Sequence, residues 1–365
     1  MAPWAHAQTR RVIHATGVVL LRILSASAPG RGAFLAPGLG VEAKAPAGFQ
    51  PESASGSNGD IQRSELRESA IQTLLLLTTS EDAQVRANAI EGLLPAPARL
   101  ETVLGAFLTD ENLGVRSVAA VTAGKLKLTS LIPALKPLVR DPSPFVRAAA
   151  VYALRACGDP INPTPLGTMV ISDPSPRVRA QAAFLLGELA DKGTVAMLRD
   201  AARVDLPRAQ VVEKKVLTVQ IAEALVKLGD EKQLHTIRAA LYPASPGELE
   251  ATVLAIQVLG ELHDKGSIGQ LRNLAVQRGP KGHAMPIEVR LAVAGALGGM
   301  GDPEYISIPL KVLGKGTEPQ QVQAVWALGQ IATPPAVREL KGLLGTDDPR
   351  LRVAVASALL HAVER

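Results

Sequence analysis

Apolar residues recur along the chain with the spacing of one helix face. In the segment DPSPRVRAQAAFLLGELAD, residues 173–191, they fall 4, 7, 8 and 11 residues after Val178. The segment DPSPFVRAAAVYALRACGD, residues 141–159, repeats this pattern at the same offsets. Because side chains three and four positions apart share one face of a helix, the spacing predicts amphipathic helices, and the alternation typical of strands is absent.

The same helical pattern occurs nine times, at steps of 30 to 39 residues. A unit of this length accommodates two helices and two short turns. The segments between the copies, such as 192–204 and 265–278, also carry a single apolar stripe. The repeat anchor, which is the Val178 position of each copy, falls at Val85, Val115, Val146, Val178, Leu217, Ala251, Val289, Gln320 and Leu351.

A single helix pair buries too few side chains to be stable alone. Each fully buried aliphatic side chain contributes about 1.5–3 kcal/mol, and ordering the backbone opposes this gain. Stacking of neighbouring pairs supplies the missing burial. The sequence therefore predicts an all-α fold, an α-solenoid (superhelix) of about nine antiparallel helix pairs over residues 61–365.

The run Asp-Pro-x-x-x-Val-Arg-x-x-Ala-x-x-Ala-Leu-Gly resembles the HEAT-repeat family, in its bacterial phycobilisome-lyase HEAT-like form. The resemblance covers residues 61–365. It implies a structural ladder, in which each Arg bonds the Asp of its own or the adjacent unit. A phosphate-binding track is the alternative for an arginine column, but acid and base recur together, which favours pairing. The ladder residues are Arg86, Arg116, Arg147, Arg179, Arg290 and Arg352, with Asp110, Asp141 and Asp173 among their acidic counterparts.

The second helix of each unit is expected to line the concave face. Positions 3, 6 and 10 residues after the anchor point away from the core stripe, into the hollow. Exposed aromatic side chains beside amides are typical of protein-binding grooves. Packing of the aromatic rings between neighbouring units is the alternative. The predicted partner-binding residues are Tyr152, Phe184, Trp326, Gln181, Gln220, Gln257 and Gln323.

Composition and charge argue against some classes of function and structure. The net charge is +5, and residues 61–365 contribute +3 of it, which is too little for a nucleic-acid footprint. Aromatic residues make up only 3% of the chain, as suits thin, closely packed helices. The single cysteine, Cys157, excludes an internal disulfide and occupies a core position.

No catalytic motif occurs in the sequence. The six histidines form none of the His-Glu pairs with which the related HEAT-type deoxyhypusine hydroxylases hold iron. We therefore expect a non-catalytic, monomeric scaffold that binds a protein or extended peptide. We expect no cofactor, no metal, no nucleic-acid partner and no membrane span. The alternatives are a lyase or chaperone subunit of the phycobilin lyase kind, and a nucleic-acid-binding helical-repeat protein.

Residues 1–60 differ from the rest of the chain. Residues 1–41 contain four Arg and no acidic residue, and a short apolar run at 18–24 is interrupted by Arg22. Residues 29–59 are rich in Gly, Pro, Ala and Ser, which is typical of a linker. The segment is interpreted as a disordered tail or a signal segment. The cytoplasm is the favoured compartment, and export through residues 1–28 is the alternative.

Overall fold

The computed structural model describes residues 55–243, 245–278 and 282–365. Within them the chain forms nine antiparallel helix pairs, which confirms the predicted all-α solenoid. The sequence-based expectations for residues 1–54 lie outside the described residues. The first described helix begins at Ser55, a few residues before the expected start of the solenoid.

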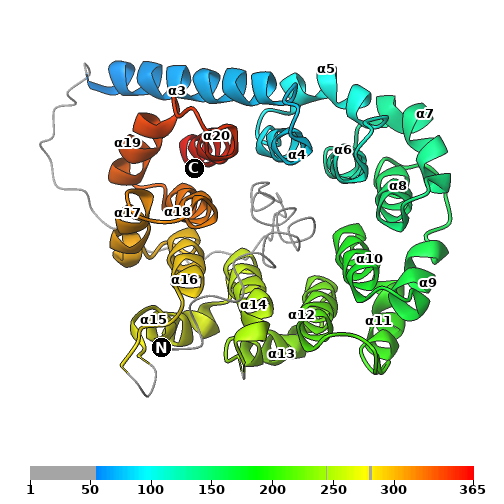
Figure 1. Ribbon diagram of the computed structural model, residues 1–365. Coiled ribbons are helices and arrows are strands. Elements are labelled where there is room, and N and C mark those ends of the chain that lie inside the picture. The colour runs from blue at the N-terminus through cyan, green and yellow to red at the C-terminus, as the bar shows by residue number, and fades with distance from the viewer. Residues whose placement is uncertain (1–54, 244, 279–281) are drawn as a thin grey trace, which may run out of the picture.

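The first helices of the pairs form the outer layer (Figure 1). Most are short and open with a single 3₁₀ turn, as at Lys192–Thr194 before α11. Pro137 converts the second half of the third one into the 3₁₀ segment Lys136–Arg140. The first helices are α3 (Ser55–Leu77), α5 (Pro97–Phe107), α7 (Ile132–Leu135), α9 (Thr164–Ser172), α11 (Val195–Ala201), α13 (Leu234–Ala239), α15 (Ile268–Val276), α17 (Ser307–Leu313) and α19 (Pro334–Leu343).

The second helices form the inner layer, and each packs against the next (Figure 1). Eight of the nine anchor residues are buried, and Gln320 is half-buried. The second helices are α4 (Ala83–Gly92), α6 (Leu113–Lys125), α8 (Pro144–Ala156), α10 (Pro176–Leu189), α12 (Val211–Lys227), α14 (Leu249–Glu261), α16 (Ile287–Gly299), α18 (Glu318–Ile331) and α20 (Pro349–Glu364).

A glycine nine residues after the anchor lets neighbouring inner helices approach closely. A Cβ atom added at Gly124 in α6 would lie 2.8 Å from the Cα of Ala153 in α8. Gly187 meets Ala224 in the same way, with an added Cβ 2.9 Å from the Cα. Such distances are below van der Waals contact, so only glycine fits. The inner layer is therefore built on direct backbone-to-alanine contact.

The solenoid closes into a ring, which the sequence analysis did not predict (Figure 1). The last inner helix, α20, packs against α3 and α4 at the start of the described chain. Arg350 Nε lies 2.8 Å from Asp82 Oδ2, and Arg67 Nε lies 2.5 Å from Glu364 Oε1. The long α3 spans this contact and covers α20. We call the contact of α20 with α3 and α4 the seam.

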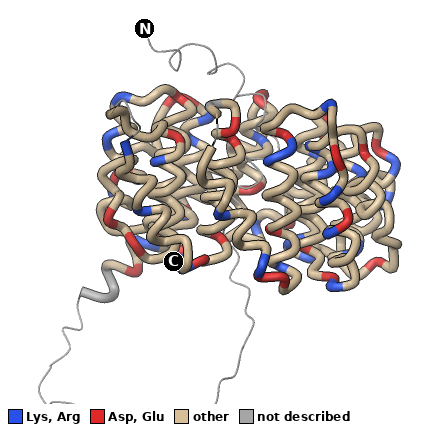
Figure 2. Tube along the Cα trace, turned by 90° about the horizontal axis from the view of Figure 1, so that it is seen from below, with Lys and Arg blue, Asp and Glu red and all other residues tan. Residues whose placement is uncertain are grey.

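Ring closure changes the expected surface. An open superhelix would offer a concave face between two free ends, and its terminal units would need capping. Here the first and last units cap each other, and the inner layer forms one continuous circle. Basic and acidic residues are interspersed along the tube (Figure 2).

Candidate partner-binding wall

The inner wall comprises the residues 3, 6 and 10 positions after the anchor of each inner helix. These three sets form belts that follow the circle of inner helices. Side chains six positions after the anchor are buried, whereas the charged and amide side chains ten positions after it are half-buried. The accessible belt is therefore the one nearest the C-terminal ends of the inner helices.

Two of the three predicted aromatic residues pack on glycines of the preceding inner helix. Tyr152 in α8 lies on Gly124, where an added Cβ would meet the ring at 2.6 Å. Trp326 in α18 lies on Gly295 of α16, where an added Cβ would meet Cζ3 at 2.3 Å. Their exposed fractions are 3% and 7%. The expectation that these rings are exposed is wrong, because each neighbouring helix offers a glycine-sized recess.

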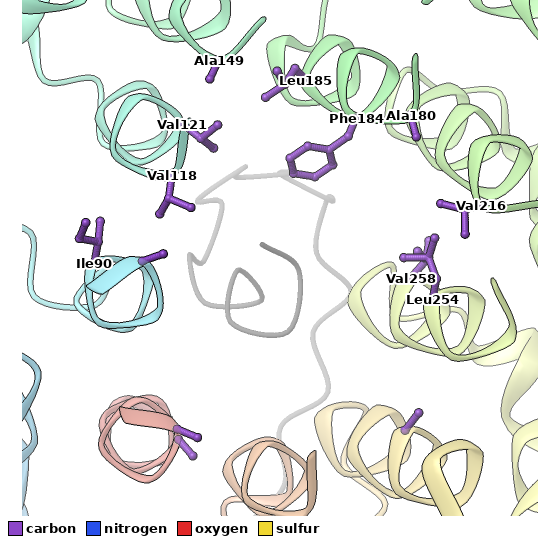
Figure 3. Close-up of a cluster of buried hydrophobic side chains, with 14 of the residues drawn as sticks. Ile90, Val118, Val121, Ala149, Ala180, Phe184, Leu185, Val216, Leu254 and Val258 are labelled. Atoms are coloured by element: carbon purple, nitrogen blue, oxygen red, sulfur yellow. The ribbon is translucent and has the colours of Figure 1, made fainter. Parts of the chain in front are cut away.

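Phe184 is the third aromatic residue, and its ring points from α10 toward the space enclosed by the inner helices (Figure 3). The ammonium of Lys125 lies 5.7 Å from the ring centroid and that of Lys227 lies 5.1 Å from it. Lys227 also forms ion pairs with Glu188 and, at 2.8 Å, with Glu223. Phe184 is 5% exposed and belongs to the buried hydrophobic cluster, at a point where charged side chains of the wall border that cluster. Cation–π attraction accounts for the two ammonium groups beside its ring.

The four predicted glutamines differ in their hydrogen bonding. Gln181 in α10 reaches across α8 and donates to Ser117 Oγ of α6 at 3.2 Å. Gln220 donates to Glu223 at 2.7 Å, and Gln323 donates to the Glu288 carbonyl oxygen at 2.7 Å. Gln257 is 1% exposed, and neither its amide nitrogen nor its oxygen has a partner in the described part of the chain. The Trp326 Nε1–H, on the same belt, also lacks an acceptor there.

Glu91 is a buried carboxyl group on α4, with 4% of its surface exposed. Burial raises the pKa of Glu91 to about 8, because desolvation disfavours the charged form, and the positive charge of Lys125 lowers it only in part. Burial in turn lowers the pKa of Lys125, against the opposing effect of Glu188 and Glu91. Sequence analysis placed Glu91 on the wall but did not single it out among the binding residues. The signal available in the sequence was that Glu91 and Glu223 are the two acidic residues on a belt of otherwise neutral residues.

Glu91 should make the stability of the protein depend on pH. Unfolded Glu91 titrates near 4.5 and folded Glu91 near 8, so between these values the folded state keeps a proton that the unfolded state has lost. The free energy of unfolding therefore falls as the pH rises through this range. We expect Glu91→Gln to equal the wild type at pH 4.5 and to exceed it at pH 9 by more than about 1 kcal/mol, as measured by urea denaturation. The exposed Glu339→Gln serves as the control, and an equal difference at both pH values would contradict the assignment.

The arginine column makes two kinds of contact. Arg86 bonds both oxygens of Asp110 in the next unit, at 2.8 and 2.9 Å, and Arg116 does the same with Asp141. Burial raises the pKa of Asp110, but the hydrogen bonds from Arg86 and the Asn112 N–H, together with the charges of Arg86 and Arg116, outweigh it, so the net shift is downward. The other four donate to backbone carbonyl oxygens instead, as Arg179 does to Asp173 at 2.6 Å. These four are Arg147, Arg179, Arg290 and Arg352.

The early start of α12 explains why Arg179 has no acidic residue to pair with at the turn of the next unit. The helix α12 begins six residues before its anchor Leu217, whereas α10 begins two residues before Val178. The turn position that holds an acidic residue in earlier units therefore lies inside α12. Asp173 itself accepts a hydrogen bond from the Ser175 N–H.

A second ladder runs through the later units, and sequence analysis missed it. Arg199, Arg238 and Arg272 lie on first helices, each eight residues after an Asp. Each bonds the corresponding Asp of the following unit, at 2.8, 2.5 and 2.9 Å. The recurring Asp-x₇-Arg spacing was the signal that could have revealed this ladder. The Arg–Asp pairs of the two ladders link successive units.

The remaining candidate chemistry is limited. Cys157 is buried and burial raises the pKa of its thiol, which suits a core residue. In the described ranges, no group of three or more His, Cys, Asp or Glu side chains is placed to hold a metal ion. None of the helices there is long and apolar enough to cross a membrane.

The fold and its ladders define a helical-repeat protein, and the family models identify the repeat. A model described as HEAT repeats matches residues 71–155 and 283–360, and one described as HEAT repeat matches residues 165–193. Together the matches span more than half of the chain. The chain belongs to the HEAT-repeat family.

Similar solved structures are distant in sequence. Human deoxyhypusine hydroxylase is 17% identical, with 85% of this chain and all of that one covered and a TM-score of 0.35. The complex of CpcE and CpcF of phycocyanin lyase from Nostoc is 18% identical, with 88% and 100% covered and a TM-score of 0.25. An engineered protein is 16% identical, with 85% and 97% covered and a TM-score of 0.31. No curated protein matches the chain. At these TM-scores the likenesses carry no argument about function.

Proposed function

We propose that this HEAT-repeat ring is a non-catalytic scaffold that binds an extended segment of a partner protein along its inner wall. The observation that carries the proposal is the buried amide of Gln257, whose donor and acceptor both lack a partner within the described residues. Buried polar groups in folded proteins are nearly always hydrogen-bonded. An amide offers one acceptor and two donors, which match the N–H and C=O groups of a peptide backbone.

Neighbouring groups on the wall support a peptide ligand. The Trp326 Nε1–H is a second buried donor without an acceptor in the described chain. Phe184 and its two lysines, together with the half-buried Gln323 and Gln330, add apolar and polar contact surface to the same circle. A nucleic acid fits this surface poorly, since Glu188, Glu223 and Glu261 would repel phosphate.

Peptide display on the full-length protein tests the proposal. Peptides selected for binding are labelled, and their affinities are measured by fluorescence anisotropy for the wild type and for Gln257→Leu. Two lost hydrogen bonds, at about 1 kcal/mol each, predict an affinity at least about tenfold weaker for this variant. Gln72→Leu, at an exposed glutamine of α3, is the matched control and should bind like the wild type. Selection of no peptide, or equal affinity for both variants, would refute the assignment.

A further inference from the structure

The inner wall is acidic within an otherwise basic shell. Residues 55–365 contain 34 Lys and Arg against 32 Asp and Glu. The wall holds two of these bases and four of these acids, which leaves 32 bases against 28 acids elsewhere. With every carboxyl group ionised, the wall therefore carries a formal charge of −2 and the remainder +4, and the wall charge is −1 while Glu91 is protonated. Charge complementarity selects and orients partners more than it adds affinity, so this contrast indicates the chemistry of the partner. The wall charges are Glu91, Lys125, Glu188, Glu223, Lys227 and Glu261.

The two lysines of the wall are already engaged. Lys227 is paired with Glu188 and Glu223, and both ammonium groups lie beside the Phe184 ring. Glu91 and Glu261 are the wall carboxylates with no ion-pair partner in the described part of the chain. They are well placed to accept an incoming positive charge.

Glu91 adds a second, independent observation. Only 4% of its surface is exposed, and no described residue forms a hydrogen bond to its carboxyl group. An uncompensated buried carboxylate is costly, so the group remains protonated until a cation reaches it. Its raised pKa, about 8, is consistent with a buried carboxyl group that has no ion-pair partner among the described residues.

The spacing of the belts fits an extended chain. The second belt, which holds Glu91, and the third belt, which holds Glu261, are four helical residues apart, or about 6 Å, which about two extended residues span. Alternate side chains of an extended segment face the same side. Basic residues at alternate positions would therefore meet the second and third belts, which hold the acidic residues of the wall.

Building on the proposed function, we propose that the partner segment is an extended polypeptide rich in Lys and Arg, which the unpaired carboxyl groups of Glu91 and Glu261 recognise on the inner wall. Recognition is by charge and hydrogen bonding alone and involves no covalent step.

Three labelled twelve-residue peptides test this inference on the full-length protein. They share one sequence except at alternate positions, which carry Arg, Gln or Glu. We expect the Arg peptide to bind at least tenfold more tightly than the other two. Glu91→Gln combined with Glu261→Gln should weaken it at least tenfold. The matched control, Glu65→Gln combined with Glu339→Gln, removes two exposed carboxylates of the outer helices and should leave the affinity unchanged.

Proton release gives a readout that nonspecific attraction would not produce. A bound guanidinium lowers the pKa of Glu91, so binding at pH 7 should release a proton. Isothermal titration in two buffers of different ionisation enthalpy measures this release, which should vanish in Glu91→Gln.

The other outcomes are decisive as well. Equal binding of the three peptides, or an equal loss in the outer double variant, overturns the inference. If display yields neutral peptides that depend on Gln257 while the Arg peptide does not bind, the basic chemistry is wrong and the scaffold proposal stands. Cross-links in the free protein from the wall to residues 1–54, or a concentration-dependent dimer, would assign the wall to another occupant and also overturn it.

Discussion

Replacement of Trp326 by alanine should lower the free energy of unfolding by about 3–5 kcal/mol. The indole is 7% exposed and fills the recess over Gly295, where an added Cβ would meet its ring at 2.3 Å. Its removal leaves a cavity between α16 and α18 that neither helix can close, because the same pair is already in contact at Gly298 and Ile331. Urea denaturation followed by circular dichroism measures the loss.

The variant Trp326→Phe distinguishes the contribution of ring packing to stability from the contribution of the Nε1–H group. Phenylalanine keeps most of the contact with Gly295 and removes the Nε1–H, which has no acceptor within the described residues. We expect this variant to lose less than about 1.5 kcal/mol. An alanine variant as stable as the phenylalanine variant would show that the ring does not pack between the units.

Gly92→Val should open the ring at its seam. A Cβ atom added at Gly92 would lie 2.1 Å from Ser357 Oγ and 3.0 Å from Leu74 Cδ2, so α20 could not keep its place against α4. Overpacking of this kind costs about 1–3 kcal/mol. Separation of the first and last units would also increase the radius of gyration, which small-angle X-ray scattering measures directly.

The control for the seam is Gly342→Val in α19. An added Cβ at Gly342 meets nothing within 4 Å, and valine is a better helix former than glycine. This variant should keep the radius of gyration and the stability of the wild type. If Gly92→Val also keeps both, the ring is not closed by this contact.

Closure has a consequence for how a partner reaches the wall. In an open solenoid, a ligand can approach the concave face from the side. In this ring, the inner wall is bounded by its own helices on every side, so an extended segment must enter along the axis or the seam must separate. The exposed Arg350–Asp82 pair contributes little to the seam, since exposed ion pairs contribute about 0–1 kcal/mol, and the apolar packing of α20 against α3 and α4 contributes more.

The amino-acid sequence by itself determined the repeat. Apolar spacing located each inner helix, because a helix that packs on one side must place its buried residues 3.6 apart. The Leu-Gly at the end of the pattern was also visible in the sequence. Its cause, the contact of Gly124 with Ala153 and of Gly187 with Ala224, became clear only once the helices were placed side by side.

Only the tertiary structure decided the ring, the burial of the wall and its unpaired groups. Closure depends on small rotations between units, which add up over nine copies. The sequence pattern of a single repeat does not reveal them. Whether Tyr152 and Trp326 are exposed depends on the residue opposite, and Gly124 and Gly295 lie in other repeats. The isolation of Glu91 and Gln257 is likewise a matter of which side chains reach them, and the local sequence does not specify distances between helices that are far apart in the chain.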